Sequence, residues 1–151
     1  MNINITTSLV TNLIATQFPE WANLPITPVP ISGWDNRTFR LGETMLVRLP
    51  SAEKYAAKVL IEQKWLPILA QHLSIPIPHP IAMGQPSQEY PWHWSVYAWL
   101  EGTSTNMLHI DKNSLQNIAK QLAEFLNELY AIDATNSYFT FLIVFSNVSH
   151  S

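Results

Sequence analysis

The sequence predicts an α+β fold in which helices pack on a small antiparallel sheet. Three apolar patterns with helical spacing lie in different parts of the chain, and a hairpin signal separates the first from the second. A later run alternates in the manner of a strand that is covered on both faces. With 151 residues, the chain is long enough for one domain or for one lobe of a larger one.

Composition and charge exclude several classes of function. The net charge of -3 gives no general attraction to nucleic acid or to an anionic membrane, so we expect neither as a partner. Cysteine is absent, which excludes disulfides and thiolate metal sites and fits a cytoplasmic protein. No apolar run is long enough for a membrane span, and residues 1–6 lack the character of a signal peptide. The histidines are scattered without the spacing of a metal site.

The first part of the chain predicts a helix and then an extended segment. Apolar residues follow helical spacing from Thr6 to Phe18, and Pro19 ends the pattern. Thr7 or Ser8 is suited to cap the start of this helix. The segment 24–31 contains three prolines, so we expect it to be extended or an edge strand at best.

A hairpin is predicted next, with its turn at residues 42–43. Alternation along the second strand places Leu46 and Arg48 on one face and Val47 on the other. An arginine between apolar neighbours needs an anionic partner or access to solvent. On spacing alone, a solvated Arg48 is the simpler interpretation.

A long amphipathic run follows the hairpin and begins at Pro50 or Ser51. Pro67 predicts a new turn or a kink within it, after which the apolar pattern continues. Glu62 lies in this run, close to two lysines. Without its neighbours in the fold, Glu62 would be interpreted as an ordinary solvated helix carboxylate.

The second half predicts two more strands and a helix. Prolines make residues 75–80 an extended connection into a short strand at residues 81–84. Residues 92–100 alternate with both faces largely apolar, which indicates a strand covered on both sides. Its clustered tryptophans are interpreted as core, with an aromatic binding platform as the alternative. A helix with a clear apolar stripe starts at residues 111–113 and ends near residues 132–135.

The chain changes character after Thr135. Residues 138–145 form a dense aromatic and β-branched run, which would be an aggregation hazard if exposed. We therefore divide the chain into residues 1–135 and an atypical apolar tail, residues 136–151. We expect the tail to be partly disordered or to mediate self-association.

Seven short motifs occur in order along the chain. They are GWDNRTFRLG (33–42), VRLP (47–50), KWLP (64–67), IPIP (75–78), YPWHWSVY (90–97), WLEG (99–102) and AIDAT (131–135). This ordered set resembles the aminoglycoside phosphotransferase family, a branch of the protein-kinase-like fold that includes macrolide and choline kinases. The resemblance covers roughly residues 8–135 and is limited to the N-terminal lobe of that fold, with the catalytic C-terminal lobe absent.

The resemblance implies a nucleotide site. The turn Gly33 to Arg37, which includes Asn36, would lie over the phosphates. Arg48 would stand where the family's strand lysine pairs with the α- and β-phosphates, and Glu62 would hold it. Arginine keeps the charge and forks well onto phosphate, although its length and shape differ from those of lysine. The backbone of Ala98 to Leu100 would bind the adenine edge. The implied cofactor-binding residues are Gly33, Asn36, Arg37, Val47, Arg48, Glu62, Tyr97, Ala98 and Leu100.

The family's catalytic motif, His-Gly-Asp-x-x-x-x-Asn, and its later magnesium-binding aspartate are missing. The nearest candidate is His109-Ile110-Asp111, but Gln116 stands where the motif requires asparagine, and Asp111 is expected to cap a helix. We predict no catalytic residue and no metal ligand in this chain. We therefore interpret it as a truncated family member, and a frameshift or premature stop near codon 136 would explain the tail.

The function implied by the resemblance is phosphorylation of a small-molecule hydroxyl, such as that of an antibiotic, with Mg-ATP as cofactor. Its partners would be a nucleotide and a small-molecule acceptor. Because the catalytic aspartates are missing, we expect this chain to be inactive alone. Two alternatives remain open: a nucleotide-binding module without catalysis, and a structural or interaction remnant.

Overall fold

The structure is a computed structural model that describes residues 3–30, 33–103 and 109–132. The chain divides into two compact units, one formed by Met1–Gln71 with Pro76–Thr103 and the other by His72–Ile75 with Ser104–Ser151. The tail predicted for residues 136–151 lies outside the described residues. Within the described ranges, no helix combines the length and the apolar character that crossing a membrane requires.

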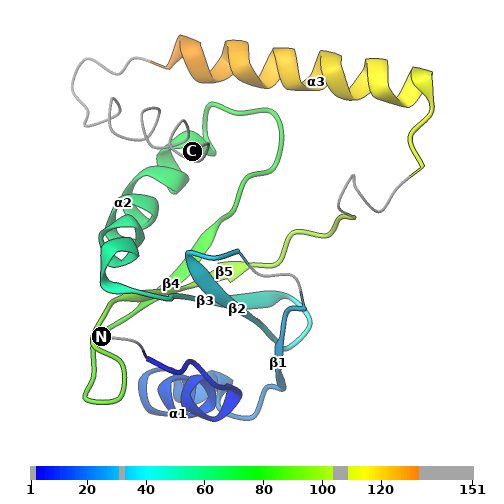
Figure 1. Ribbon diagram of the computed structural model, residues 1–151. Helices are drawn as coiled ribbons and strands as arrows, with labels where there is room; N and C mark the ends of the chain where they lie inside the picture. The colour runs from blue at the N-terminus through cyan, green and yellow to red at the C-terminus, as the bar shows by residue number, and fades with distance from the viewer. Residues whose placement is uncertain (1–2, 31–32, 104–108, 133–151) are drawn as a thin grey trace. The chain divides into compact units, whose positions relative to one another are not determined.

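The first unit is built on a five-stranded antiparallel sheet with strand order β1-β2-β3-β5-β4 (Figure 1). The strands are β1 (Ile26–Pro28), β2 (Asn36–Leu41), β3 (Met45–Pro50), β4 (Pro80–Gly84) and β5 (Trp94–Ala98). The predicted hairpin is formed by β2 and β3, and Gly42, with φ 59°, supplies the left-handed conformation of its turn. The predicted α+β fold and the proline-rich edge strand are confirmed.

Helix α1 (Thr7–Gln17) covers one face of the sheet and forms the main core with it. The buried members of this core are Val10, Leu13, Ile14, Phe39, Leu41, Val47, Leu49, Tyr90, Trp94 and Val96. The helix cap is Thr6, one residue earlier than the first expected candidate, because the Thr6 hydroxyl accepts a hydrogen bond from the Leu9 amide at 3.2 Å. A short 3₁₀ helix, η1 (Pro19–Trp21), follows.

Helix α2 (Glu53–Leu69) lies on the opposite face of the sheet from α1 (Figure 1). Pro67 lies inside the last turns of α2, and the helix continues past it to its end. The Gln63 side-chain amide donates to the Ala82 carbonyl at 3.0 Å and to the Ser95 hydroxyl at 2.9 Å. Because Ala82 belongs to β4 and Ser95 to β5, this one side chain ties α2 to two strands.

Strand β5 is buried on both faces, as its apolar alternation predicts. Its Trp94 packs against Gly84, which lies directly opposite in β4. A Cβ atom at residue 84 would lie 1.9 Å from the Trp94 ring, so only glycine fits here. The tryptophan cluster is therefore core at Trp94, which is fully buried.

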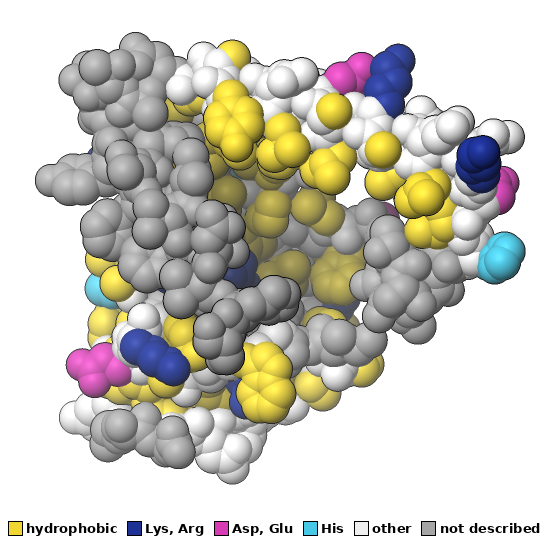
Figure 2. Space-filling model, turned by 45° about the horizontal axis from the view of Figure 1, so that its top comes forward, with side chains coloured by type: hydrophobic (Ala, Val, Ile, Leu, Met, Phe, Trp, Pro, Cys, Tyr) yellow, Lys and Arg dark blue, Asp and Glu magenta, His cyan; other side chains and the backbone are white. Residues whose placement is uncertain are grey.

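The second unit contains helix α3 (Lys112–Ala131). The predicted cap is confirmed, since the Asp111 carboxylate accepts from the Ser114 amide at 2.7 Å. Within this unit, the Ser74 amide donates to the Glu128 carboxylate at 2.8 Å, which attaches the segment His72–Ile75 to α3. Figure 2 shows hydrophobic side chains in a row along α3. The large exposed ones are Leu115, Ile118, Leu122, Leu126 and Tyr130.

Candidate functional site

Arg48 and Glu62 form the centre of the candidate site. Arg48 lies in β3 on the face that α2 covers, and its Nη2 lies 3.2 Å from Glu62 Oε1. The two side chains are 31% and 21% exposed, so the ion pair is only partly shielded from solvent. The pairing that the sequence left open is therefore present, and the solvated interpretation of Arg48 is replaced by an anionic partner from the neighbouring helix.

Two further residues hold this pair in place. With its amide oxygen facing the guanidinium, Asn36 accepts from Arg48 Nη2 and Nε, each at 3.2 Å. The Tyr97 hydroxyl donates to Glu62 Oε2 at 2.6 Å, so both carboxylate oxygens are engaged. In the part of the chain that the structure describes, Nη1 of Arg48 has no hydrogen-bond partner. This amino group remains available to an anion such as a phosphate oxygen.

The Tyr97 hydroxyl is the donor in this hydrogen bond, because an ionised carboxylate can only accept. The side chain is 1% exposed, and burial raises the pKa of its hydroxyl well above the ordinary value of 10.0, with the negative charge of Glu62 raising it further. The Arg48 guanidinium lies 5.8 Å from the centre of the Tyr97 ring. Arg48, Glu62, Tyr97 and Asn36 therefore form one connected group, which we call the Arg48 cluster.

The turn before β2 is fixed to the start of α2. The Ser51 hydroxyl donates to the carbonyls of Trp34, at 2.7 Å, and of Asp35, at 3.1 Å. The Asp35 carboxylate lies 2.9 Å from Lys58 Nζ, and this hydrogen bond lowers the pKa of Asp35 below its ordinary value of 3.8. Asp35 is therefore engaged in holding the turn, next in sequence to Asn36 of the Arg48 cluster.

Gly33 lies before β2 and Arg37 lies at the start of β2, and both are exposed. Arg37 Nη1 donates to the Gly33 carbonyl at 3.3 Å, which closes the turn on itself. A Cβ atom at Gly33 would meet nothing within 4 Å, so the backbone here is open to a ligand from outside. The amides of this turn could therefore approach a phosphate group closely.

The expected adenine-binding segment follows β5. The Ala98 amide already donates to the His79 carbonyl at 2.9 Å, and the Trp99 amide donates to the Thr44 carbonyl at 2.8 Å. Leu100 is 42% exposed and lies beyond the strand. The segment leaves the sheet next to the β2–β3 turn.

Val47, which the resemblance placed among the cofactor-binding residues, lies on the face opposite to Arg48, whereas Leu46, which was not among them, lies on the Arg48 face. Val47 is fully buried in the core on the α1 face, opposite to Arg48, so its side chain cannot contact a ligand beside Arg48. Leu46 lies on the Arg48 face, paired with Tyr97 across the β3–β5 ladder. The signal that would have found Leu46 is the alternation itself, since it shares a face with Arg48 two residues away.

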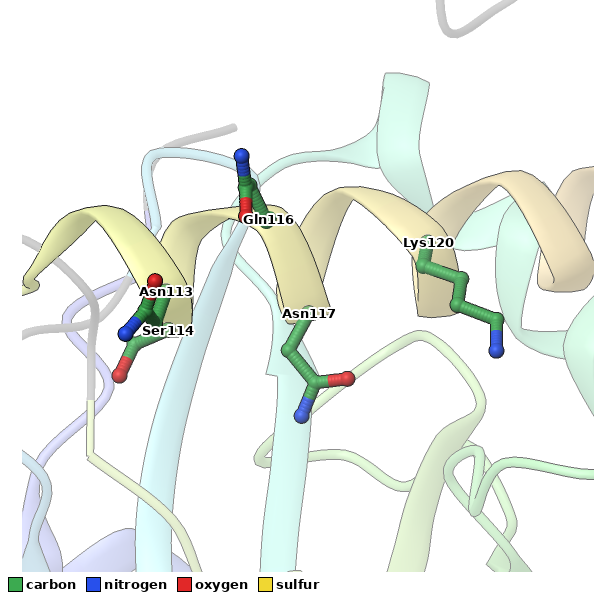
Figure 3. A pocket seen from close by; sticks show the side chains of 5 residues that line it. All are labelled: Asn113, Ser114, Gln116, Asn117 and Lys120. Atoms are coloured by element: carbon green, nitrogen blue, oxygen red, sulfur yellow. The ribbon is translucent and has the colours of Figure 1, made fainter.

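No acidic or histidine cluster that could hold a metal ion occurs among the described residues. A cavity of about 460 Å³ on α3 is lined by Asn113, Ser114, Gln116, Asn117 and Lys120 (Figure 3). These side chains all come from one helix of the second unit, and each is exposed. This surface lacks the buried charges and convergent groups of the Arg48 cluster, so it is not a candidate site.

Comparison of the fold with solved structures finds aminoglycoside phosphotransferases. The GDP and kanamycin complex of APH(2'')-IIIa matches with a TM-score of 0.74 and 25% identity, over 83% of this chain and 42% of that one. The streptomycin–ATP complex of APH(2'')-IIa matches with a TM-score of 0.60 and 19% identity, over 87% and 41%. The chain thus spans less than half the length of these structures. A sequence comparison with curated proteins gives no match.

The family model for the phosphotransferase enzyme family, APH, matches residues 26–143. The match includes all five strands, both partners of the Arg48–Glu62 pair and helix α3. It also extends past Thr135, into the segment that the sequence analysis set apart. The chain therefore belongs to the phosphotransferase enzyme family and has the kinase-like fold of the aminoglycoside phosphotransferases.

Proposed function

We propose that this chain binds a purine nucleoside triphosphate on the Arg48 face of its sheet, as the nucleotide-binding part of a phosphotransferase. The observation that carries the proposal is the Arg48 cluster, in which a helix carboxylate holds a strand arginine at 3.2 Å and one amino group of that arginine has no partner among the described residues. An arginine fixed in this way is suited to bind phosphate oxygens, because its orientation is set before the ligand arrives. Complexes of similar proteins with GDP, ATP and ADP support the ligand class.

Each remaining residue of the proposed site has a role consistent with its position. The turn from Gly33 to Arg37 would cover the phosphates with backbone amides. The segment from Ala98 to Leu100 would present backbone groups to the purine edge, and Leu46 would contact the base from the sheet. Magnesium would arrive with the triphosphate, since the Arg48 cluster offers one carboxylate and that carboxylate is already engaged.

For the phosphotransferase of which this chain would be the nucleotide-binding part, we propose an acceptor of the aminoglycoside class, which would be phosphorylated on a hydroxyl group. Similar structures were solved with kanamycin, streptomycin and gentamicin, which supports this class. In the present chain Asp35 is paired with Lys58, and Asp111 caps α3. Because both carboxylates are already bonded, neither is free to act as a catalytic base or as a magnesium ligand. A second candidate function for this chain by itself is therefore nucleotide binding without transfer of a phosphoryl group.

Titration calorimetry with Mg-ATP and Mg-GTP tests the proposal. Replacing Arg48 by alanine removes a charge-assisted contact to phosphate, and we expect the dissociation constant to rise roughly 10- to 100-fold. Arg48→Lys keeps the charge without the fork and should give an intermediate value. Lys120→Ala removes an equal charge from α3, where Lys120 lies 3.9 Å from Glu124, and should leave binding unchanged. Equal affinities of the wild type and Arg48→Ala would refute the site.

A further inference from the structure

Arg40 is a second arginine on the Arg48 face of the sheet that the Arg48 cluster does not use. In the β2–β3 ladder Arg40 pairs with Leu46, and in the β3–β5 ladder Leu46 pairs with Tyr97. Residues that pair directly point to the same face. Arg40 therefore lies one row along the same face from Arg48, toward the end at which β5 leaves the sheet.

The Arg40 side chain reaches across to the segment after β5. Its guanidinium carbon lies 3.9 Å from the centre of the Trp99 ring, and Nη2 lies 3.4 Å from Glu101 Oε1. Nη2 also donates to the carbonyl of Glu43 in the hairpin turn. Arg40 thus connects the hairpin turn to Trp99 and Glu101.

Of the two contacts that Arg40 makes with the segment after β5, the ring contact is less weakened by solvent than the ion pair. Glu101 is 82% exposed, and an ion pair at such a position is weakened by solvent. The Trp99 ring nitrogen is buried and has no hydrogen-bond partner among the described residues. The orientation of the indole is therefore set by packing and by the cation above it, and not by a hydrogen bond from its own N–H group.

The Trp99 backbone is fixed at one point, where its amide donates to the Thr44 carbonyl at 2.8 Å. Beyond Trp99 the chain leaves the sheet, and Gly102 has open space around it. Without Arg40, the segment from Leu100 to Gly102 would be held, among the described residues, by that hydrogen bond and by the packing of the Trp99 indole ring. Its position relative to the sheet would then be poorly defined.

We propose that Arg40 is a positioning residue for purine recognition, which holds the segment 99–101 at the distance from the sheet that a purine requires. This inference rests on the proposed nucleotide site, because the segment it positions is the one expected to contact the base. Arg40 would act through Trp99 and would not touch the phosphates. Its loss should therefore weaken the binding of the base and spare the binding of a phosphate chain.

The test compares a nucleotide with a phosphate chain that has no base. The dissociation constants of Mg-ATP, Mg-GTP and inorganic tripolyphosphate are measured for the full chain and for Arg40→Ala. Loss of the cation over Trp99 should weaken nucleotide binding roughly fivefold, and tripolyphosphate binding should not change. Arg40→Lys keeps a cation near the ring and should recover part of the nucleotide affinity. Hydrogen exchange at the amides of residues 99–101 should be faster in Arg40→Ala.

Lys64→Ala is the matched control, since Lys64 is an exposed cation 4.8 Å from the Trp65 ring on α2. It should alter neither dissociation constant. Equal nucleotide affinity in Arg40→Ala and the wild type would overturn the inference about Arg40 and leave the nucleotide site intact. Equal losses for nucleotide and tripolyphosphate would also overturn it, because Arg40 would then act on the phosphates or on the whole fold. A wild-type chain that binds tripolyphosphate but no nucleotide would overturn both proposals.

Discussion

At the scale of single residues, Tyr97 shows how a buried hydroxyl can support a charged pair. Its hydroxyl donates to Glu62 at 2.6 Å, so the carboxylate that faces Arg48 is held from both sides. The family resemblance includes Tyr97 among the cofactor-binding residues, but its contact with Glu62 could not be predicted from the sequence. The two residues are 35 positions apart, and the contact depends on how α2 packs against β5.

Replacing Tyr97 by phenylalanine tests this support. The change removes one hydrogen bond to a charged group, so we expect the free energy of unfolding to fall by about 1–2 kcal/mol and nucleotide affinity to fall with it. Tyr90→Phe is the matched control, because the buried Tyr90 hydroxyl donates to the neutral Pro50 carbonyl at 2.7 Å. It should lower stability in urea unfolding while leaving nucleotide affinity unchanged. A Tyr97→Phe variant with normal affinity would show that Glu62 needs no second partner.

At the scale of elements, the sequence predicts the existence of the strands better than their neighbours. The hairpin was predictable because Gly42 marks a local turn. Val47 was assigned to the site by resemblance although alternation placed it opposite to Arg48, and the structure follows the alternation. Leu46 and Gln63 were missed for different reasons. Leu46 was visible in the pattern, whereas the contacts of Gln63 with β4 and β5 depend on tertiary packing.

The contact between β4 and β5 provides a test at this scale. Gly84→Ala would place a methyl group against the fully buried Trp94 ring, and we expect a loss of about 1–3 kcal/mol in the free energy of unfolding. Gly102→Ala is the control, because nothing lies within 4 Å of a Cβ atom there. Urea unfolding followed by tryptophan fluorescence measures both. Equal midpoints for the two variants would mean that the sheet adjusts around residue 84 at no cost.

At the scale of the whole molecule, the family and the fold were predictable because seven motifs occur in the correct order. This chain covers 42% of the APH(2'')-IIIa structure. Nucleotide binding by the chain therefore does not imply that the chain catalyses phosphoryl transfer. Asp35 and Asp111 are engaged in holding a turn and capping a helix. The catalytic motif that the family uses was not found in the sequence.

We therefore expect this chain alone to transfer no phosphate to an aminoglycoside, even where it binds Mg-ATP. Mass spectrometry of kanamycin after incubation with the chain and Mg-ATP measures the product directly. The background is set by a reaction without protein. Phosphorylated kanamycin above that background, lost again in Arg48→Ala, would mean that the catalytic groups lie in this chain in an arrangement that differs from the family's motif.

The Gln63 side chain has a consequence for how the Arg48 cluster behaves before any ligand arrives. By bonding to β4 and to β5, it opposes a swing of α2 away from the sheet, which would separate Glu62 from Arg48. These two hydrogen bonds favour the arrangement in which Arg48 and Glu62 are already paired, which reduces the fraction of molecules that must rearrange before a nucleotide binds. The chain would then differ from kinases in which movement of a helix switches the site on and off. Its nucleotide affinity would depend mainly on the contacts between the site and the ligand.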